Sequence, residues 1–290
     1  MRYRNPVLAE ADHEADLRAD RREFWQLLLF VGALVVGVGF ALDRLAWWAA
    51  PRLPFAWEQE IARTLHLDTL PVNVVAGASR AMQPQHLKVE AALQQRLNRI
   101  AHAAALPPDI VVTAHFVDSA TVNAVATLGG HITVFSGLLN RLEYEEELDA
   151  VLAHELGHVQ HRHMVRQLSR GLTAAAGLSL LGIRSAALNR WLLGDLQQLQ
   201  QLAYSREAER EADSTALVVA QQMHGHMAGV QRLFERFEAL QNERGGQVNE
   251  WEAFTKSHPL PAERAQAARA AGTDAARPLT PLRAPFKAAT

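Results

Sequence analysis

Two histidines and a glutamate lie within five residues of each other, in the stretch HELGH at residues 154–158. Side chains four residues apart on an α-helix project from the same face, so His154 and His158 can bind one metal ion. Neutral imidazole is a common ligand of Zn²⁺. Glu155 lies beside the two ligands, where a carboxylate can take a proton from water that the ion activates. A catalytic zinc ion typically has a third protein ligand, which the rest of the chain must supply.

The third ligand is expected from the stretch YSREAEREAD at residues 204–213, which contains four acidic side chains. Glu209 and Asp213 are four residues apart and share a helical face. Glu209 can therefore bind the metal, while Asp213 accepts a hydrogen bond from the free ring N–H of a ligand histidine. Glu207 and Glu211 share a different face with two arginines, and we interpret that face as solvated. Taken alone, Glu209 could equally be a surface acid; its pairing with HELGH favours a ligand.

The amino-acid composition limits which side chains can bind a metal ion. The chain of 290 residues has no cysteine, which excludes disulfides and thiolate ligands, and it has 13 histidines. Its formal net charge of −2 lacks the basic footprint of a nucleic-acid-binding protein. We therefore expect one Zn²⁺ ion with histidine and carboxylate ligands, and no nucleic-acid partner.

The residues with metal chemistry are expected on two helices, over residues 143–167 and 192–222. Apolar residues at helical spacing predict further helices, over residues 85–105, over 227–242 and after Pro261. The β-branched stretches 109–117 and 131–135 are typical of strands, and Gly129-Gly130 precedes the second. The expected fold class is therefore α+β and mainly helical, with a small β-sheet beside the HELGH helix.

An uncharged apolar stretch, FWQLLLFVGALVVGVGFAL, occupies residues 24–42. At about 1.5 Å per residue, such a helix is about as long as the hydrocarbon core of a bilayer is thick. Five arginines precede the stretch and two follow it closely, so the positive-inside rule places the N-terminus in the cytoplasm. A buried helix of a soluble protein and a cleaved signal peptide are the alternatives; acidic residues of the leader, namely Glu10, Asp12, Glu14, Asp16 and Asp20, argue against a signal peptide.

Taken together, these residues resemble the zinc metallopeptidases of the HtpX and CAAX prenyl endopeptidase (Ste24-like) family. The specific elements are HELGH and, 51 residues after His158, Glu209 within SREAEREAD. Supporting elements are Val122-Asn123-Ala124, the segment 129–134, Gly137-Leu138-Leu139, and His258-Pro259 with Arg264. The resemblance covers roughly residues 70–270. It implies a gluzincin-type domain in which His154, His158 and Glu209 bind zinc and Glu155 is the catalytic base.

The chain departs from those branches in one respect, because several members carry multiple membrane spans and this chain has one clear span. It is more similar to a single-span, membrane-anchored branch. The expected segments are a cytoplasmic tail (1–23), a transmembrane helix (24–42), a juxtamembrane linker with a short helix (43–80), the zinc metallopeptidase domain (81–271) and a flexible C-terminal tail (272–290). The apolar stretch 171–183 is either a buried helix or a flap.

Several further roles are expected near the metal. His258 is a candidate for the catalytic proton donor to the leaving amine. The resemblance adds a competing role, a latch that approaches the metal and switches activity off, and an ordinary loop histidine before a proline is the third interpretation. The segment Gly130, His131, Ile132, Thr133, Val134 is expected to be an edge strand that pairs with an extended substrate, with an ordinary inner strand as the alternative. His161 and His163 are expected to face solvent or to form a second layer.

The resemblance implies a membrane-anchored zinc metalloendopeptidase that hydrolyses peptide bonds of protein substrates. It further implies a bacterial inner-membrane location, a catalytic domain in the periplasm and a role in envelope protein quality control. The competing hypothesis is a latent or inactive zinc-bound, chaperone-like adaptor that binds unfolded proteins.

Overall fold

The computed structural model describes residues 13–49, 52–64, 83–169, 204–242, 254, 257–258, 262–271 and 277–287. The apolar stretch 171–183 and the first part of the helix predicted over 192–222 lie outside the described residues.

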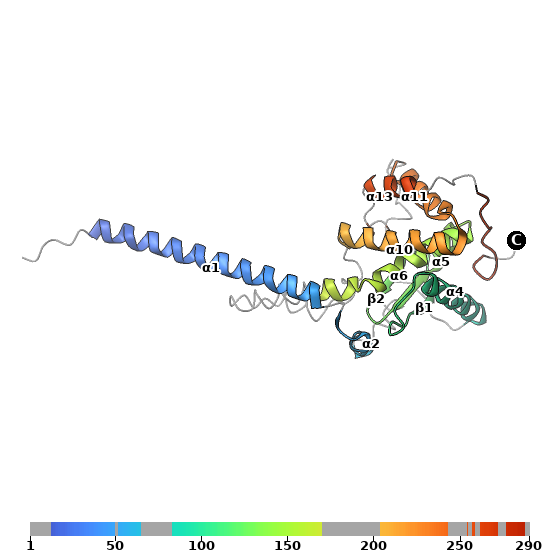
Figure 1. Cartoon of the computed structure of the whole chain (residues 1–290), viewed down its shortest axis with the longest axis horizontal. Helices are drawn as coiled ribbons and strands as arrows, with labels where there is room; N and C mark the ends of the chain where they lie inside the picture. The colour runs from blue at the N-terminus through green and yellow to red at the C-terminus, as the bar shows by residue number, and fades with distance from the viewer. Residues whose placement is uncertain are drawn as a thin grey trace, which may run out of the picture.

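Helix α1 (His13–Ala49) projects away from the other elements as one long rod (Figure 1). Among the described residues, its part over Arg21–Ala49 is long and apolar enough to cross a membrane. Its large apolar side chains are exposed, as in Leu29 and Val36, which excludes a helix buried in this chain's own core. The helix extends beyond the predicted span of residues 24–42 at both ends, so the first residues of the predicted juxtamembrane linker continue α1.

Three strands form a small mixed sheet, β1 (Thr113–Val117), β2 (Ala124–Thr127) and β3 (His131–Phe135), in the order β1-β3-β2. Strand β3 pairs in parallel with β1 and antiparallel with β2. The β2–β3 turn contains Gly129 and Gly130, both with φ above +80°, a conformation that favours glycine. A Cβ on Gly130 would also collide with the carbonyl oxygen of Val111, so the turn requires glycine there.

The prediction of an edge strand over Gly130–Val134 is wrong, because β3 has a hydrogen-bonded neighbour on each side. The error has a physical source in β2, which the sequence pattern did not reveal. Its four residues are all buried, so they show no alternation of polar and apolar side chains. The outer strands of this sheet are β1 and β2.

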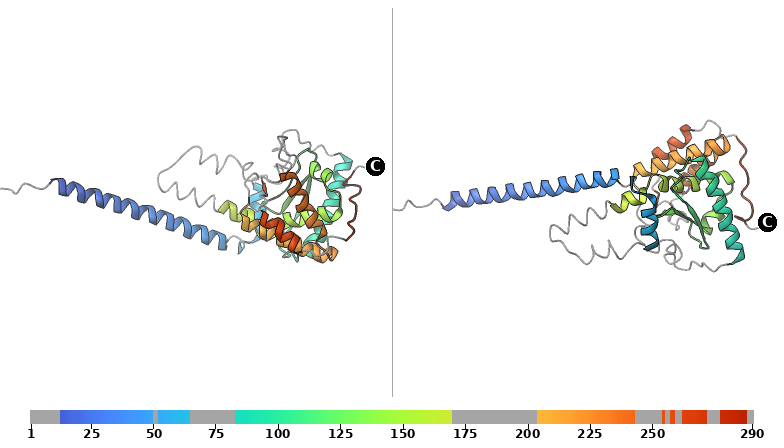
Figure 2. Two further views of the ribbon diagram at one scale, coloured as in Figure 1. Left: turned by 90° about the horizontal axis from the view of Figure 1, so that it is seen from above. Right: turned by 60° about the horizontal axis from the view of Figure 1, so that its bottom comes forward.

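The helices form layers on the sheet (Figures 1 and 2). Helix α6 lies between the sheet and α10; α11 packs on both α6 and α10, α13 packs on α10 and α11, and α4 packs on β1. Their bounds are α2 (Phe55–Thr64), α4 (Pro84–Ala103), α5 (Ser136–Arg141), α6 (Glu145–Gln160), α10 (Arg206–His224), α11 (Ala228–Asn242) and α13 (Ala262–Ala271). The mainly helical architecture with a small sheet beside the HELGH helix is thus confirmed.

Helix α6 is the centre of the core. Residues 146–159 are all buried, and Leu148, Leu152 and Leu156 are completely inaccessible to solvent. Burying one such side chain contributes about 1.5–3 kcal/mol to stability. A helix buried on all sides must satisfy its polar side chains internally, which brings their partners to it from other elements.

Part of the predicted juxtamembrane linker is a structural element of the domain. Helix α2 buries Phe55 and Glu58. Glu58 accepts a hydrogen bond from the backbone N–H of Gly129 (3.0 Å) and pairs with Arg162 just beyond α6. The domain predicted to start at residue 81 therefore also includes α2.

The predicted flexible tail over 272–290 is wrong for residues 277–287, which pack against the start of α6. The backbone N–H and the hydroxyl of Thr280 both donate to the carboxylate of Glu146. Leu282 is buried, and its N–H donates to the carbonyl of Glu143. Composition rich in alanine and proline did not reveal these tertiary contacts.

Candidate metal centre

The two histidines of HELGH converge because α6 presents them one turn apart. Glu145, Glu146 and Glu147 occupy its first turn, where negative charge favours the helix dipole. The carboxylate of Glu147 also accepts a hydrogen bond from the N–H of Tyr144. Along the same helix, Nε2 of His154 lies 3.1 Å from Nε2 of His158, and both side chains are buried.

Helix α10 brings a carboxylate to the same point. The Ser205 hydroxyl caps this helix by accepting from the N–H of Ala208. Glu209 is buried, with Oε2 3.5 Å from Nε2 of His154 and Oε1 3.7 Å from Nε2 of His158. The three residues predicted as ligands are therefore brought together from two helices.

The two helices approach closely at Gly157. A Cβ there would lie 2.8 Å from the Cα of Ala212 and 3.1 Å from the Cβ of Thr215. This small residue at the crossing lets α10 come near enough for Glu209 to face the histidines.

Asp213 lies one turn beyond Glu209, with Oδ1 3.0 Å from Nδ1 of His154. This is the contact that the sequence-based hypothesis requires of it. Arg264, on α13, donates to both carboxylate oxygens of Asp213 at 2.6 and 2.7 Å. The same guanidinium lies 2.6 Å from Oε2 of Glu209. Arg264 appeared in the sequence only as part of a resemblance, and its pairing with both acids was not predicted.

Glu155 faces the sheet next to the histidines. Its Oε2 accepts a hydrogen bond from the N–H of Ala126 on β2 (2.7 Å). Its Oε1 has no hydrogen bond among the described residues and lies 3.3 Å from Nε2 of His258. Burial raises the pKa of Glu155.

His258 lies inside the cluster and is completely buried. Its Nδ1 is 3.1 Å from Oε1 of Glu209 and 3.3 Å from Nε2 of His154. Ligand atoms from His154, His158, Glu209 and His258 all lie within 4.8 Å of one another. A plain loop histidine would not be enclosed in this way.

The electrostatics of the cluster attract positive charge. Burial opposes protonation of His154, but the carboxylates of Asp213 and Glu209 raise its pKa to about 10. Burial also opposes ionisation of Glu209, yet hydrogen bonds from His154 and His258 hold its pKa well below the usual range. Burial lowers the pKa of His158 and keeps that ring neutral. A bound cation would supply the positive charge that a proton on His154 otherwise provides.

The side chains present fit a zinc ion. Two imidazole nitrogens and a carboxylate oxygen are the donor set that zinc accepts, and the chain has no cysteine to offer instead. The unpaired buried Oε1 of Glu155 fits a group that must accept a proton. Leaving such an atom unpaired costs about 1–3 kcal/mol, which a functional role explains.

Tyr204 was not predicted as a neighbour, whereas a second layer was one of the two positions expected for His163, and both side chains contact His158. Tyr204 stacks on it, with ring centroids 3.8 Å apart and planes 16° from parallel. His163 is buried, and its Nδ1 lies 2.8 Å from Nδ1 of His158.

The prediction that Glu211 belongs to a solvated face is wrong, because Glu211 pairs with His163 and Arg166. The spacing of residues within α10 could not indicate that His163 and Arg166, which follow α6, lie beside this helix.

The chain is similar to a known protein family and to several individual proteins. The profile of peptidase family M48 matches residues 87–271. The chain is 36% identical over 104 residues to a putative beta-barrel assembly-enhancing protease of Vibrio cholerae, which covers 32% of this chain and 21% of that protein. It is 33% identical over 153 residues to the mitochondrial metalloendopeptidase OMA1 of Schizosaccharomyces pombe, covering 50% and 42%. It is 32% identical over 153 residues to metalloprotease LoiP of Escherichia coli, covering 50% and 56%. The matches thus span between a fifth and just over half of these relatives.

Proposed function

The chain belongs to peptidase family M48, and from this premise we propose that it is a zinc-dependent metalloendopeptidase that hydrolyses peptide bonds of protein substrates. The observation that carries the proposal is the convergence of His154, His158 and Glu209 with Glu155 beside them. The relatives named above, a metalloendopeptidase, a metalloprotease and a putative protease, support the same activity.

In this proposal His154, His158 and Glu209 hold one zinc ion. When bound, zinc acts as a Lewis acid that lowers the pKa of water to about 7 and polarises a carbonyl. Asp213 accepts the Nδ1–H of His154 and so keeps Nε2 of that ring turned toward Glu209.

Glu155 is the proposed base. Its Oε1 takes the proton of the attacking water and then delivers it to the amide nitrogen that leaves. Burial raises the pKa of Glu155, so its carboxylate is a stronger base than that of an exposed glutamate. The bond from Ala126 to Oε2 holds the carboxylate so that Oε1 stays free for this transfer.

We propose that the substrate binds along the outer strand β2 and not along β3. Ala126 directs its N–H toward Glu155, and its carbonyl oxygen lies 3.5 Å from the hydroxyl of Tyr204. Both groups therefore turn away from β3 on an outer strand. An extended peptide that pairs with the rest of this outer edge, beyond the two groups that Ala126 already uses, would lie next to Glu155 and would be held by its backbone, with little dependence on sequence.

For His258 the geometry favours a latch over a proton donor. Its Nδ1 lies among the atoms proposed to bind zinc, where it would take the fourth ligand position. A catalytic zinc ion needs that position open for water or substrate. The described arrangement therefore corresponds to a resting form, and activity requires His258 to leave.

We further propose that α1 anchors the chain in the bacterial inner membrane and that the catalytic domain faces the periplasm. The length and apolar character of α1 and the arginines before it support this arrangement. A role in envelope protein quality control is supported by relatives named as beta-barrel assembly-enhancing proteases. Placement in a single-span branch of the HtpX and CAAX prenyl endopeptidase type is part of the same proposal.

The test is casein cleavage by the full chain in detergent, with and without a chelator, in wild-type and Glu155→Gln forms. We expect the wild type to cleave casein only when zinc is present. Glu155→Gln should keep its zinc and lose about 10²- to 10⁴-fold in rate, because the base is gone. Glu207→Gln, which alters an exposed glutamate of α10, is the matched control and should cleave normally.

Equal rates for Glu155→Gln and the wild type, with zinc bound in both, would remove Glu155 from the mechanism. A chain that binds zinc but cleaves nothing, even with His258 replaced by alanine, would support the adaptor hypothesis.

A further inference from the structure

His163 reaches the metal centre by a turn of the chain. Helix α6 ends at Gln160, and Arg162 adopts a positive φ of 57°. Its guanidinium is held by Glu58 of α2, which fixes the turn. The turn places the ring of His163 beside that of His158, with centroids 5.0 Å apart, and buries it.

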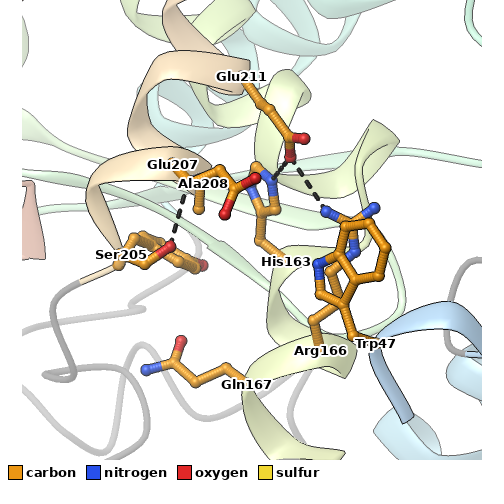
Figure 3. A pocket seen from close by; sticks show the side chains of 9 residues that line it. Trp47, His163, Arg166, Gln167, Ser205, Glu207, Ala208 and Glu211 are labelled. Atoms are coloured by element: carbon orange, nitrogen blue, oxygen red, sulfur yellow. Dashed lines mark hydrogen bonds and ion pairs between the residues drawn. The ribbon is translucent and has the colours of Figure 1, made fainter. Parts of the chain in front are cut away.

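A chain of polar contacts continues from His163 (Figure 3). Its Nε2 lies 2.7 Å from Oε2 of Glu211, and Nη1 of Arg166 lies 3.0 Å from the same oxygen. The guanidinium of Arg166 stands 5.2 Å from the ring centroid of Trp47, near the end of α1. The contacts therefore run from His158 to the end of the membrane anchor.

The positions of the protons follow from the geometry. Nε2 of His158 faces His154 and Glu209, so a ring that binds a metal there carries its proton on Nδ1. That N–H points at Nδ1 of His163, which must accept. His163 then carries its own proton on Nε2 and donates it to Glu211. Each contact thus has one donor and one acceptor.

We propose that His163, oriented by Glu211, is a positioning residue that fixes the tautomer and ring direction of the zinc ligand His158. This inference rests on the proposed zinc site. Outer hydrogen bonds of this kind orient ligand histidines and raise their basicity. The two histidine ligands have different partners, because His154 donates to the carboxylate of Asp213 whereas His158 donates to a neutral ring.

Nδ1 of His163 can accept the Nδ1–H of His158 only while the His163 ring carries its single proton on Nε2. A protonated His163 would place a second N–H against that of His158 and would break the contact.

The test uses two amide substitutions that separate the two bonds of His163. In His163→Asn the side-chain amide occupies about the position of Nδ1, so it can still accept from His158 while it loses Glu211. In His163→Gln the amide occupies about the position of Nε2, so it keeps Glu211 and loses His158. Both variants are polar and uncharged, so they place similar demands on folding.

The measurement is the zinc affinity of the full chain in detergent, by competition with a chromophoric chelator, together with the absorption spectrum of the cobalt-substituted form. We expect His163→Gln to bind zinc about 10- to 100-fold more weakly than the wild type and to change the cobalt spectrum. His163→Asn should remain closer to the wild type in both readouts. Glu207→Gln, on the wall of the same cavity as Glu211, is the control and should bind like the wild type.

Equal zinc affinities for the wild type and His163→Gln would overturn the proposal, as would a greater loss in His163→Asn than in His163→Gln. A structural role alone would lower the unfolding temperature of both metal-free variants and leave the zinc affinity of the folded chain unchanged. Because the readout is binding, a wild type that binds zinc but does not cleave casein counts against the proposed function and leaves this inference standing. A wild type that binds no zinc would overturn both.

Discussion

At the scale of single residues, the metal centre depends on how buried charges are paired. Removing an ion from water costs several kcal/mol unless partners compensate. Arg264 meets both Glu209 and Asp213, which share its positive charge. It contacts Oε2 of Glu209, so Oε1 remains on the side of His158 and His258. Replacing Arg264 would therefore disturb two acids at once, and His258 is the more selective position to test.

His258→Ala is expected to raise the rate of casein cleavage several-fold, because the fourth ligand position is then open to water. The measurement is the initial rate per bound zinc, with zinc content determined on the same sample. Alanine also removes a large buried ring next to Phe254, so some loss of thermal stability should accompany the gain in rate.

The rival role for His258 predicts the opposite result. If the ring donates a proton to the leaving amine, His258→Ala would keep its zinc and lose activity by about 10²-fold or more. That outcome would remove the latch and restore the proton donor.

At the scale of elements, the site depends on the crossing of α6 and α10. Gly157→Ala tests that crossing, because the added Cβ would press on Ala212 and Thr215. Overpacking typically costs about 1–3 kcal/mol, while the better helix propensity of alanine returns about 1 kcal/mol. We therefore expect a modest loss of stability, and a larger loss of zinc affinity because α10 carries Glu209 away from the histidines.

Thermal unfolding and chelator competition measure the two effects. Gly37→Ala is the matched control, because no atom lies within 4 Å of a Cβ built at that position on α1. Unchanged zinc affinity in Gly157→Ala would show that the close approach of the helices is not what positions Glu209.

The helices of the metal centre could be predicted because the spacing of neighbouring residues within each helix is enough to indicate them. Spacing of four residues puts His154 above His158 and Glu209 above Asp213, and the structure places both pairs as the spacing requires. For His163 the sequence left solvent and a second layer as alternatives, because its contact with His158 depends on a positive φ at Arg162 that a distant helix stabilises.

Other elements escaped prediction because their stability comes from tertiary contacts. Strand β2 has no alternating pattern, and its pairing with β3 reverses the predicted position of the edge. The segment 277–287 is low in apolar residues, yet Leu282 and the bonds of Thr280 to Glu146 hold it against α6. The residue pattern of a single helix or strand does not indicate which distant segment it packs against, as in the contact between Thr280 and Glu146.

At the scale of the whole molecule, the domain lies directly at the end of α1. Trp47 of that helix meets Arg166, and α2 begins a few residues later and packs on the sheet turn. If α1 crosses the bilayer, the metal centre lies close to the membrane surface, on the side where the C-terminal end of α1 emerges. The orientation of α1 therefore decides which compartment supplies substrates.

Cysteine labelling tests this orientation, because the chain contains no cysteine and any label reports the introduced site alone. Asn5→Cys lies before the span, and Asp109→Cys is an exposed position in the domain. The arginine excess before the span favours a cytoplasmic N-terminus. In intact bacterial spheroplasts, an impermeant maleimide should therefore modify Asp109→Cys at once and Asn5→Cys only after lysis. The reverse pattern would place the domain in the cytoplasm, and the wild-type chain should remain unlabelled throughout.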